Sequence, residues 1–262
     1  MPASITIAVI GGSGLYSLFD EAESERREID TPYGGAEVTV GELGGRTIAF
    51  LTRHGRGHTA APHLINYRAT IWALASLGVR AIVSSAAVGG LNPDFPPGTL
   101  VLPDQYIDRT SGRDDTFYDR GSVQHLGSAD PFCPALHEVA VAAVPDARPS
   151  ATVVVIQGPR FSTRAESQWM RAAGGDIVNM TLYPEVALAA ELNIGTTNLA
   201  YVTDADAAPA DHELSSELVF ARFAEAQPRI VSSIESIVAA IPQDYEPREL
   251  IPAAEVAAVL GR

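Results

Sequence analysis

The chain has 262 residues, a hydrophobic content of 46% and a formal net charge of −14 at pH 7. This length and apolar content predict a folded chain with a sizeable core, and the acidic balance argues against a nucleic-acid-binding surface. The sequence has no apolar run of membrane-spanning length and no signal-like amino terminus, so a soluble cytoplasmic protein is predicted. Its single cysteine, Cys133, excludes an internal disulfide and fits a reducing compartment.

The first predicted element is a buried strand at residues 5–10, which breaks into the glycine-rich loop 11–14. Such loops let backbone N–H groups close around a phosphate because no Cβ blocks the approach. A dinucleotide fingerprint read from Gly12 needs glycine where Ser17 stands, and no lysine follows as in a triphosphate loop. A tight strand exit and a small-anion site both stay open, and the Ser13 hydroxyl suits the anion.

Beyond this loop, short β-branched runs alternate with segments of helical periodicity. Two strands around a Gly44-Gly45 turn are predicted in 36–54, and a helix in 62–78. Further strands are predicted in 79–85, 98–108, 151–158, 175–181 and 195–206, and helices in 134–144, 163–173, 184–192 and 215–240. This order predicts a single α/β domain over 1–262, with a mixed, mostly parallel central sheet flanked by helices on both faces.

Polar side chains follow several of these strands, where ligands of parallel sheets gather. Arg53 and His54 bring a fork of donors and an imidazole, and Ser13, Ser85 and Thr181 bring hydroxyls. Any one such hydroxyl is more typical of a turn than of a ligand site, whereas Arg53 and His54 are as typical of a surface ion pair as of function. Because donors recur at several strand ends, the pattern favours an anion site.

Asp204 and Asp206 form a second polar group, two residues apart at the end of the last strand. Their side chains point the same way and are able to share a proton or hold a metal. No further carboxylate or histidine flanks them at close spacing, so no metal is expected. A solvated loop start stays open as an alternative.

Together, the motifs "GGSGLY", "TRHGRGHTAAPHLINYRATIWAL", "QGPRFSTRAES", "VNMTLYPEVALAAEL" and "VTDAD" resemble the trimeric purine nucleoside phosphorylases, in particular members that act on 5′-methylthioadenosine. The likeness runs from about residue 5 to the helix after Asp206. It implies a mixed-sheet α/β fold and a pentosyl transfer in which inorganic phosphate displaces a purine from the ribosyl C1′. No cofactor is implied, because phosphate is a co-substrate.

The resemblance also implies the roles of individual residues. The implied phosphate shell is Ser13, Arg53, His54, Ser85, Ala86 and Thr181. The implied base and ribose contacts are Phe161, Ser162, Met180, Asp204 and Asp206. His125 resembles a histidine that closes the 5′ pocket of a neighbouring subunit, which implies a homotrimer, and Leu218 and Phe220 are candidates for the wall of that pocket.

The expected reaction is phosphorolysis of 5′-methylthioadenosine to adenine and 5-methylthioribose 1-phosphate, a step of purine and methionine salvage. Cleavage of the glycosidic bond leaves negative charge on the purine, and a neutral Asp204 would donate a proton to N7. The alternative is a 6-oxopurine nucleoside or methylthioinosine phosphorylase. Those 6-oxopurine relatives carry Glu and Asn where this chain has Ser162 and Asp204, so an aminopurine is favoured. A non-catalytic nucleotide sensor stays open as a further class.

Overall fold

The computed structural model describes residues 5–19, 23–55, 57–205 and 215–262. Its strands are β1 (Ile7–Gly11), β2 (Glu25–Thr31), β3 (Gly34–Leu43), β4 (Arg46–Thr52), β5 (Ala81–Gly90), β6 (Leu100–Val101), β7 (Gln105–Arg109), β8 (Thr152–Ile156), β9 (Ile177–Asn179) and β10 (Gly195–Ala205). Its helices are η2 (Pro62–Leu64), α1 (Tyr67–Ser76), α2 (Pro134–Ala143), α3 (Arg164–Ala172), α4 (Leu182–Glu191), α5 (Ser216–Ala240) and α6 (Ala253–Leu260).

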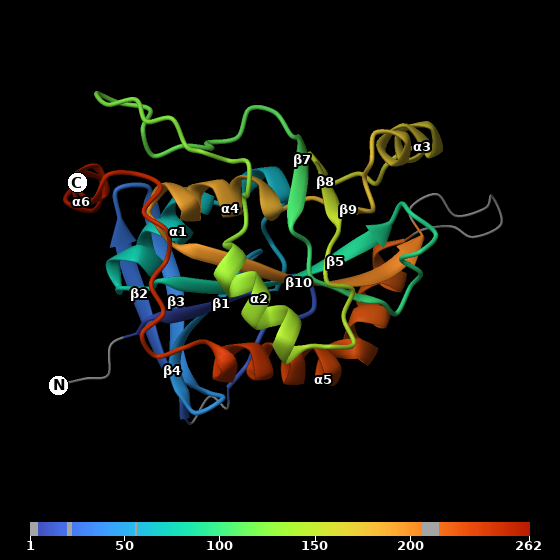
Figure 1. Ribbon diagram of the computed structural model, residues 1–262, viewed down its shortest axis with the longest axis horizontal. Helices are drawn as coiled ribbons and strands as arrows, with labels where there is room; N and C mark the ends of the chain where they lie inside the picture. The colour runs from blue at the N-terminus through green and yellow to red at the C-terminus, as the bar shows by residue number, and fades with distance from the viewer. Residues whose placement is uncertain (1–4, 20–22, 56, 206–214) are drawn as a thin grey trace.

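The ten strands form one mixed sheet (Figure 1), which confirms the predicted α/β fold. Its main path runs β2-β3-β4-β1-β5-β9-β8-β7, and β10 pairs with β5 and β6. The strands β4, β1, β5 and β10 are mutually parallel, so their carboxyl ends meet at one edge. The set β7, β8 and β9 is also parallel, but β9 runs antiparallel to β5. The carboxyl ends of both sets therefore approach each other along β5.

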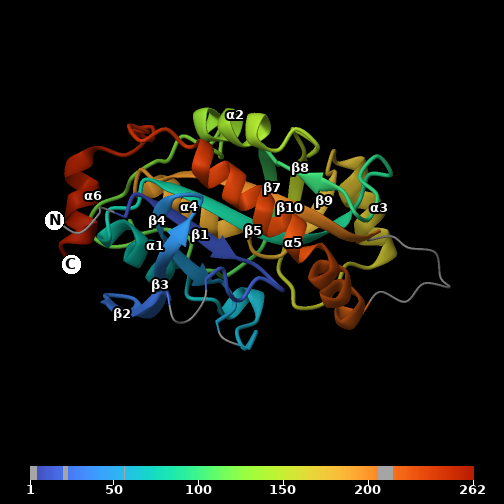
Figure 2. The same ribbon diagram turned by 90° about the horizontal axis from the view of Figure 1, so that it is seen from below.

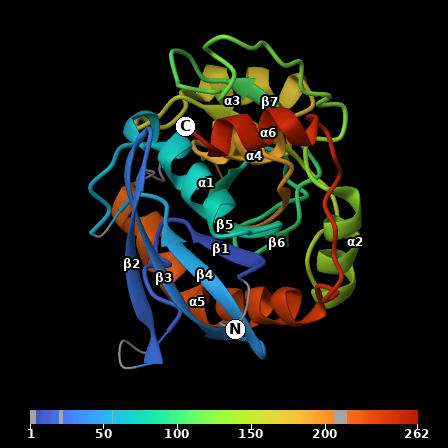
Figure 3. The same cartoon turned by 90° about the vertical axis from the view of Figure 1, so that its left-hand side faces the viewer.

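Helices cover both faces of the sheet because alternate residues of its central strands are buried on opposite sides. In β1, Ile7 and Val9 pack with α2 and α5, whereas Ala8 and Ile10 pack with α1 and α4. Figure 2 shows α2 and α5 on the near face, and Figure 3 shows α1 and α4 across the sheet from α5. No helix in the described part of the chain has both the length and the apolarity that a bilayer crossing needs.

Several local features differ from the sequence-based expectation: helix α6 was not predicted, and the strand predicted in 98–108 is divided into β6 and β7. Two further differences have a clear physical reason. The predicted helix over 62–78 is split into η2 and α1, because the Asn66 side chain accepts from Ala69 N at 3.1 Å and caps a new helix there. The polar segment Glu25–Thr31 is a strand that pairs only with β3. An edge strand is partly solvated, so it needs no apolar alternation to form.

Candidate active site

A cavity of about 450 Å³ lies where the two sets of strand ends approach each other. Its lining residues come from the loop after β1, the end of β4, the middle of β5, the segments after β8 and β9, the end of β10 and the start of α5. They are Ser13, Arg53, His54, His58, Pro62, Ala86, Ala87, Val88, Gly89, Ile156, Pro159, Phe161, Val178, Asn179, Met180, Thr181, Thr203, Asp204, Val219 and Phe220. We call this cavity the central pocket.

Most of the residues predicted from the sequence line this pocket. They are Ser13, Arg53, His54, Ala86, Phe161, Met180, Thr181, Asp204 and Phe220. Ser85 lies directly beneath, since its Oγ accepts a hydrogen bond from Gly12 N at 3.0 Å. The structure thus brings residues from seven separated stretches of sequence to one place.

Besides Ser85, four predicted residues are not part of that lining. Ser162 lines an adjacent hollow of about 400 Å³ that shares Ile156 with the central pocket. His125 and Leu218 are exposed and lie outside the lining within this subunit. Asp206 lies outside the described residues, so its pairing with Asp204 stays a prediction.

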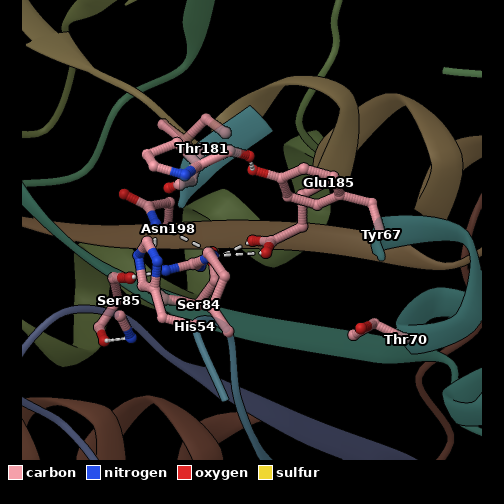
Figure 4. Close-up of polar contacts among 12 residues, drawn as sticks. His54, Tyr67, Thr70, Ser84, Ser85, Thr181, Glu185 and Asn198 are labelled. Atoms are coloured by element: carbon pink, nitrogen blue, oxygen red, sulfur yellow. Dashed lines mark hydrogen bonds and ion pairs between the residues drawn. The ribbon is translucent and has the colours of Figure 1, made fainter. Parts of the chain in front are cut away.

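Arg53 is held by Glu185, a residue that the sequence reasoning did not select. Its Nε donates to Glu185 Oε2 at 2.6 Å, its Nη2 donates to Oε1 at 2.8 Å, and its Nη1 donates to Ser85 O at 2.8 Å. Both side chains are almost fully buried, at 2% and 3% exposed. Burial opposes the charged guanidinium, but Glu185 outweighs this and raises the pKa of Arg53. Figure 4 shows Glu185 turned toward β5, the strand that carries Ser84 and Ser85.

The position of Arg53 between Glu185 and Ser85 explains why the loop after β1 needs glycine at Gly12. A Cβ on Gly12 would lie 2.5 Å from Ser85 O and 2.8 Å from Arg53 Nη1. Glycine is required there because the loop packs directly on the guanidinium and on the β5 backbone. Since a guanidinium carries five N–H groups, donors on Nη1 and Nη2 remain for a ligand beside this loop.

His54 is neutral in this environment. Its Nδ1 lies 2.9 Å from Ala60 O, and a carbonyl only accepts, so Nδ1 carries the proton and Nε2 keeps its lone pair. Its ring stacks on His58 at 4.1 Å, and His58 meets Phe220 edge-on at 5.2 Å. Burial, with a contribution from the charge of Arg53, lowers the pKa of His54 to about 4. His58, which was not among the residues selected from the sequence, also lines the pocket.

The depressed pKa of His54 predicts acid sensitivity. Its pKa is about 4 when folded and near 6.5 when unfolded, so between these values only the unfolded chain takes up the proton. We expect the free energy of unfolding to fall by roughly 2–3 kcal/mol between pH 7.5 and 4.5 because of this residue. Urea denaturation in phosphate-free buffer measures it. His54→Gln should show a correspondingly shallower pH profile, and an equally steep one would contradict the assignment.

Asp204 lies at the other end of the pocket, since it pairs with Gly89 at the end of β5, whereas Arg53 donates to the Ser85 carbonyl earlier on the same strand. The pairing of β10 with β5 shifts register between Val202 and Asp204, and such bulges re-aim side chains. Asp204 is 6% exposed, and its Oδ1 accepts from Thr203 Oγ1 at 2.7 Å. Arg222 of α5 fixes the same turn by donating to Thr203 O at 2.6 Å. A buried carboxylate therefore faces a pocket whose other end is cationic.

The start of α4 is organised by Asn179, another buried residue that the sequence reasoning missed. Its Oδ1 accepts from Thr181 N at 2.6 Å and from Leu182 N at 2.8 Å. These bonds fix Thr181, which lines the pocket, at the amino end of α4. The signal that points to Asn179 is its position at the junction of a strand and a helix, with a side chain suited to capping.

Comparison with known proteins agrees with this geometry. A sequence model described as the phosphorylase superfamily matches residues 6–240. The chain belongs to the phosphorylase superfamily. The match contains every described residue named above for the pocket of this phosphorylase, from the loop after β1 to α5.

Individual relatives of this phosphorylase are similar over most of its length. S-methyl-5′-thioadenosine phosphorylase of Mycolicibacterium smegmatis is 51% identical over 203 residues, which is 77% of each chain. Purine nucleoside phosphorylase of Streptomyces coelicolor is 45% identical over 255 residues, covering 92% of this chain and 90% of the relative. The crystal structure of methylthioadenosine phosphorylase from Schistosoma mansoni in complex with adenine superposes with a TM-score of 0.87, at 31% identity and over 98% of both chains.

Proposed function

We propose that this phosphorylase converts 5′-methylthioadenosine and inorganic phosphate into adenine and 5-methylthioribose 1-phosphate. One observation carries the proposal: a single pocket has the Arg53 guanidinium at one end and the buried Asp204 carboxyl at the other. Phosphorolysis needs an anion on one side of C1′ and a proton donor at the purine on the other side. The names of the relatives at about 50% identity support methylthioadenosine as the nucleoside.

The cationic end of the pocket suits phosphate as nucleophile. Arg53 offers its remaining N–H donors, Thr181 lies at the start of α4, and Ser13 and the Ala86 amide lie on neighbouring walls. Ser85 Oγ accepts from Gly12 N, so its own proton is available to the anion. His54 Nε2, with its lone pair, accepts from a protonated phosphate oxygen. An anion held here stabilises positive charge that develops on the ribose.

The other end suits an aminopurine. Phe161 and Met180 supply apolar walls for the base and ribose, and Ser162 directly follows Phe161 in the sequence. Asp206 is proposed as a further contact to the base. Asp204, buried and hydrogen-bonded by Thr203, is the proton donor for N7 when it is neutral. As a carboxylate it accepts from a 6-amino group, whereas it opposes a 6-oxo oxygen acceptor to acceptor. The 6-oxopurine alternative is therefore not favoured.

We further propose a homotrimer in the cytoplasm, in which the substrate is a small nucleoside of purine and methionine salvage. His125 is exposed and remote from the pocket lining of its own subunit, which is the placement expected of a residue that closes a neighbour's 5′ pocket. Phe220 lines the pocket beside His58, and Leu218 lies exposed two residues earlier on α5. These residues are the proposed 5′ wall.

The proposal predicts an absolute need for phosphate. Release of adenine from methylthioadenosine by the full chain should require added inorganic phosphate, because the anion is the nucleophile. Adenine is followed by liquid chromatography, and the sugar product by phosphorus NMR as a 1-phosphate. Equal rates in phosphate-free buffer, with free methylthioribose as product, would contradict phosphorolysis. Tight binding of the nucleoside without any turnover would indicate a sensor instead.

A further inference from the structure

We propose that Arg113 is a positioning residue that sets the width of the nucleoside side of the central pocket. It reaches the pocket backbone from the segment between β7 and α2, and it does not line the pocket itself. The kinetic test of this inference rests on the function proposed above, whereas the contacts that support the inference do not depend on that function.

The two walls that Arg113 connects are the ends of β8 and β9. These strands pair in parallel as far as Val155 and Asn179, and the ladder stops there. One residue later, Ile156 and Met180 both line the pocket, so the strands separate where the pocket opens. Where the strands separate, the backbone carbonyls that follow them lose the hydrogen-bond partners of the ladder. Because these carbonyls are partly buried, they need another donor.

Arg113 supplies that donor to both walls at once. Its Nη2 donates to Gln157 O at 3.0 Å after β8 and to Met180 O at 2.9 Å after β9, with a longer contact of 3.4 Å to Ile156 O. Its Nη1 donates to Tyr183 O at the start of α4. Because the guanidinium is a rigid plane, these bonds fix the spacing of the strand ends as a short ladder would.

The segment that carries Arg113 is anchored by other contacts, so the arginine is not needed to hold it. Glu191 of α4 accepts from Thr116 Oγ1 at 2.6 Å and from Phe117 N at 2.7 Å. Asp115 accepts from Tyr183 Oη at 2.7 Å. With the segment fixed in this way, removal of the guanidinium should release the strand ends and leave the segment in place.

The phosphate end of the pocket has fixing contacts of its own. Glu185 binds Arg53 at two points, and Asn179 holds Thr181. Arg113 meets this end only next to Thr181, through the Met180 carbonyl. Loss of Arg113 should therefore weaken use of the nucleoside more than use of phosphate, a difference that general destabilisation would not produce.

The test compares Arg113→Met and Arg113→Lys with the parent chain. Arg120→Met is the matched control, because Arg120 lies on the same segment with its side chain 86% exposed. For Arg113→Met we expect KM for methylthioadenosine at saturating phosphate to rise roughly tenfold or more, since small displacements of a binding wall cost that much. KM for phosphate should change less than about twofold. For Arg113→Lys, KM for methylthioadenosine should lie between those of the parent and of Arg113→Met, because a compact ammonium cannot span both walls. The control Arg120→Met should match the parent.

Equal losses for nucleoside and phosphate, or an Arg113→Met variant with parental KM values, would overturn the proposal. If Arg113→Met does not fold, the Arg113→Lys variant carries the same comparison. Failure of the parent to turn over methylthioadenosine would overturn the proposed function and not this inference. In that case calorimetric titration of the parent and the variants with adenine decides. Weaker adenine binding by the Arg113 variants supports the proposed positioning role of Arg113, and unchanged binding refutes it.

Discussion

Replacing Glu185 by leucine should lower the free energy of unfolding by about 3–5 kcal/mol, the range for a buried charge that loses its partner. Arg53 would then be left buried, and of the three hydrogen bonds described above it would keep the one to the Ser85 carbonyl. Replacing both members, in Arg53→Met with Glu185→Leu, should recover most of the loss, because an apolar pair of similar volume fits a buried site.

Urea denaturation of the parent, the single variant and the double variant measures this effect. Arg160→Met is the control, since Arg160 and Glu166 form a similar two-point ion pair at the surface, with side chains 67% and 43% exposed. Solvent already screens that pair, so little change is expected. The double variant should regain stability without regaining phosphate-dependent turnover. A single Glu185→Leu variant of parental stability would show that Arg53 does not depend on this carboxylate.

Replacing Asp204 by asparagine should reduce turnover of methylthioadenosine by roughly a hundredfold or more, the usual contribution of a general acid. The amide cannot give up a proton to N7, but it is able to donate a hydrogen bond to a 6-oxo group. The ratio of inosine-type to adenosine-type turnover should therefore rise. Adding Ser162→Glu should raise it further, because Ser162 lies beside the pocket and this pair is the one of the 6-oxopurine relatives.

The experiment measures both variants and the parent on methylthioadenosine, methylthioinosine, adenosine and inosine. Asp244→Asn is a matched control, because it makes the same chemical change at an exposed position after α5. If Asp204→Asn keeps parental rates and the same ranking of substrates, Asp204 does not read the base. The assignment of an aminopurine substrate would then lose its main support.

Much of the fold was predictable because its signals are local. The turn at Gly44-Gly45 and the paired strands around it were confirmed, since a polar turn between alternating apolar runs is typical of a hairpin. The long helix after the last strand was also confirmed, and Phe223, Ile230, Ile234 and Ile237 form its buried stripe. The edge strand β2 was not predicted, because a partly solvated edge leaves no clear apolar pattern.

The sequence by itself determined the class of fold and the polar groups at the strand ends, because parallel strands bring their carboxyl ends to one edge whatever their order. Only the tertiary structure decided which groups act together. Glu185 reaches Arg53, and Arg113 reaches the backbone at Gln157 and Met180, across separations in sequence that no periodicity encodes. The physical reason is that local pattern reports which face of an element is buried, whereas the partner of a buried charge depends on how distant elements pack.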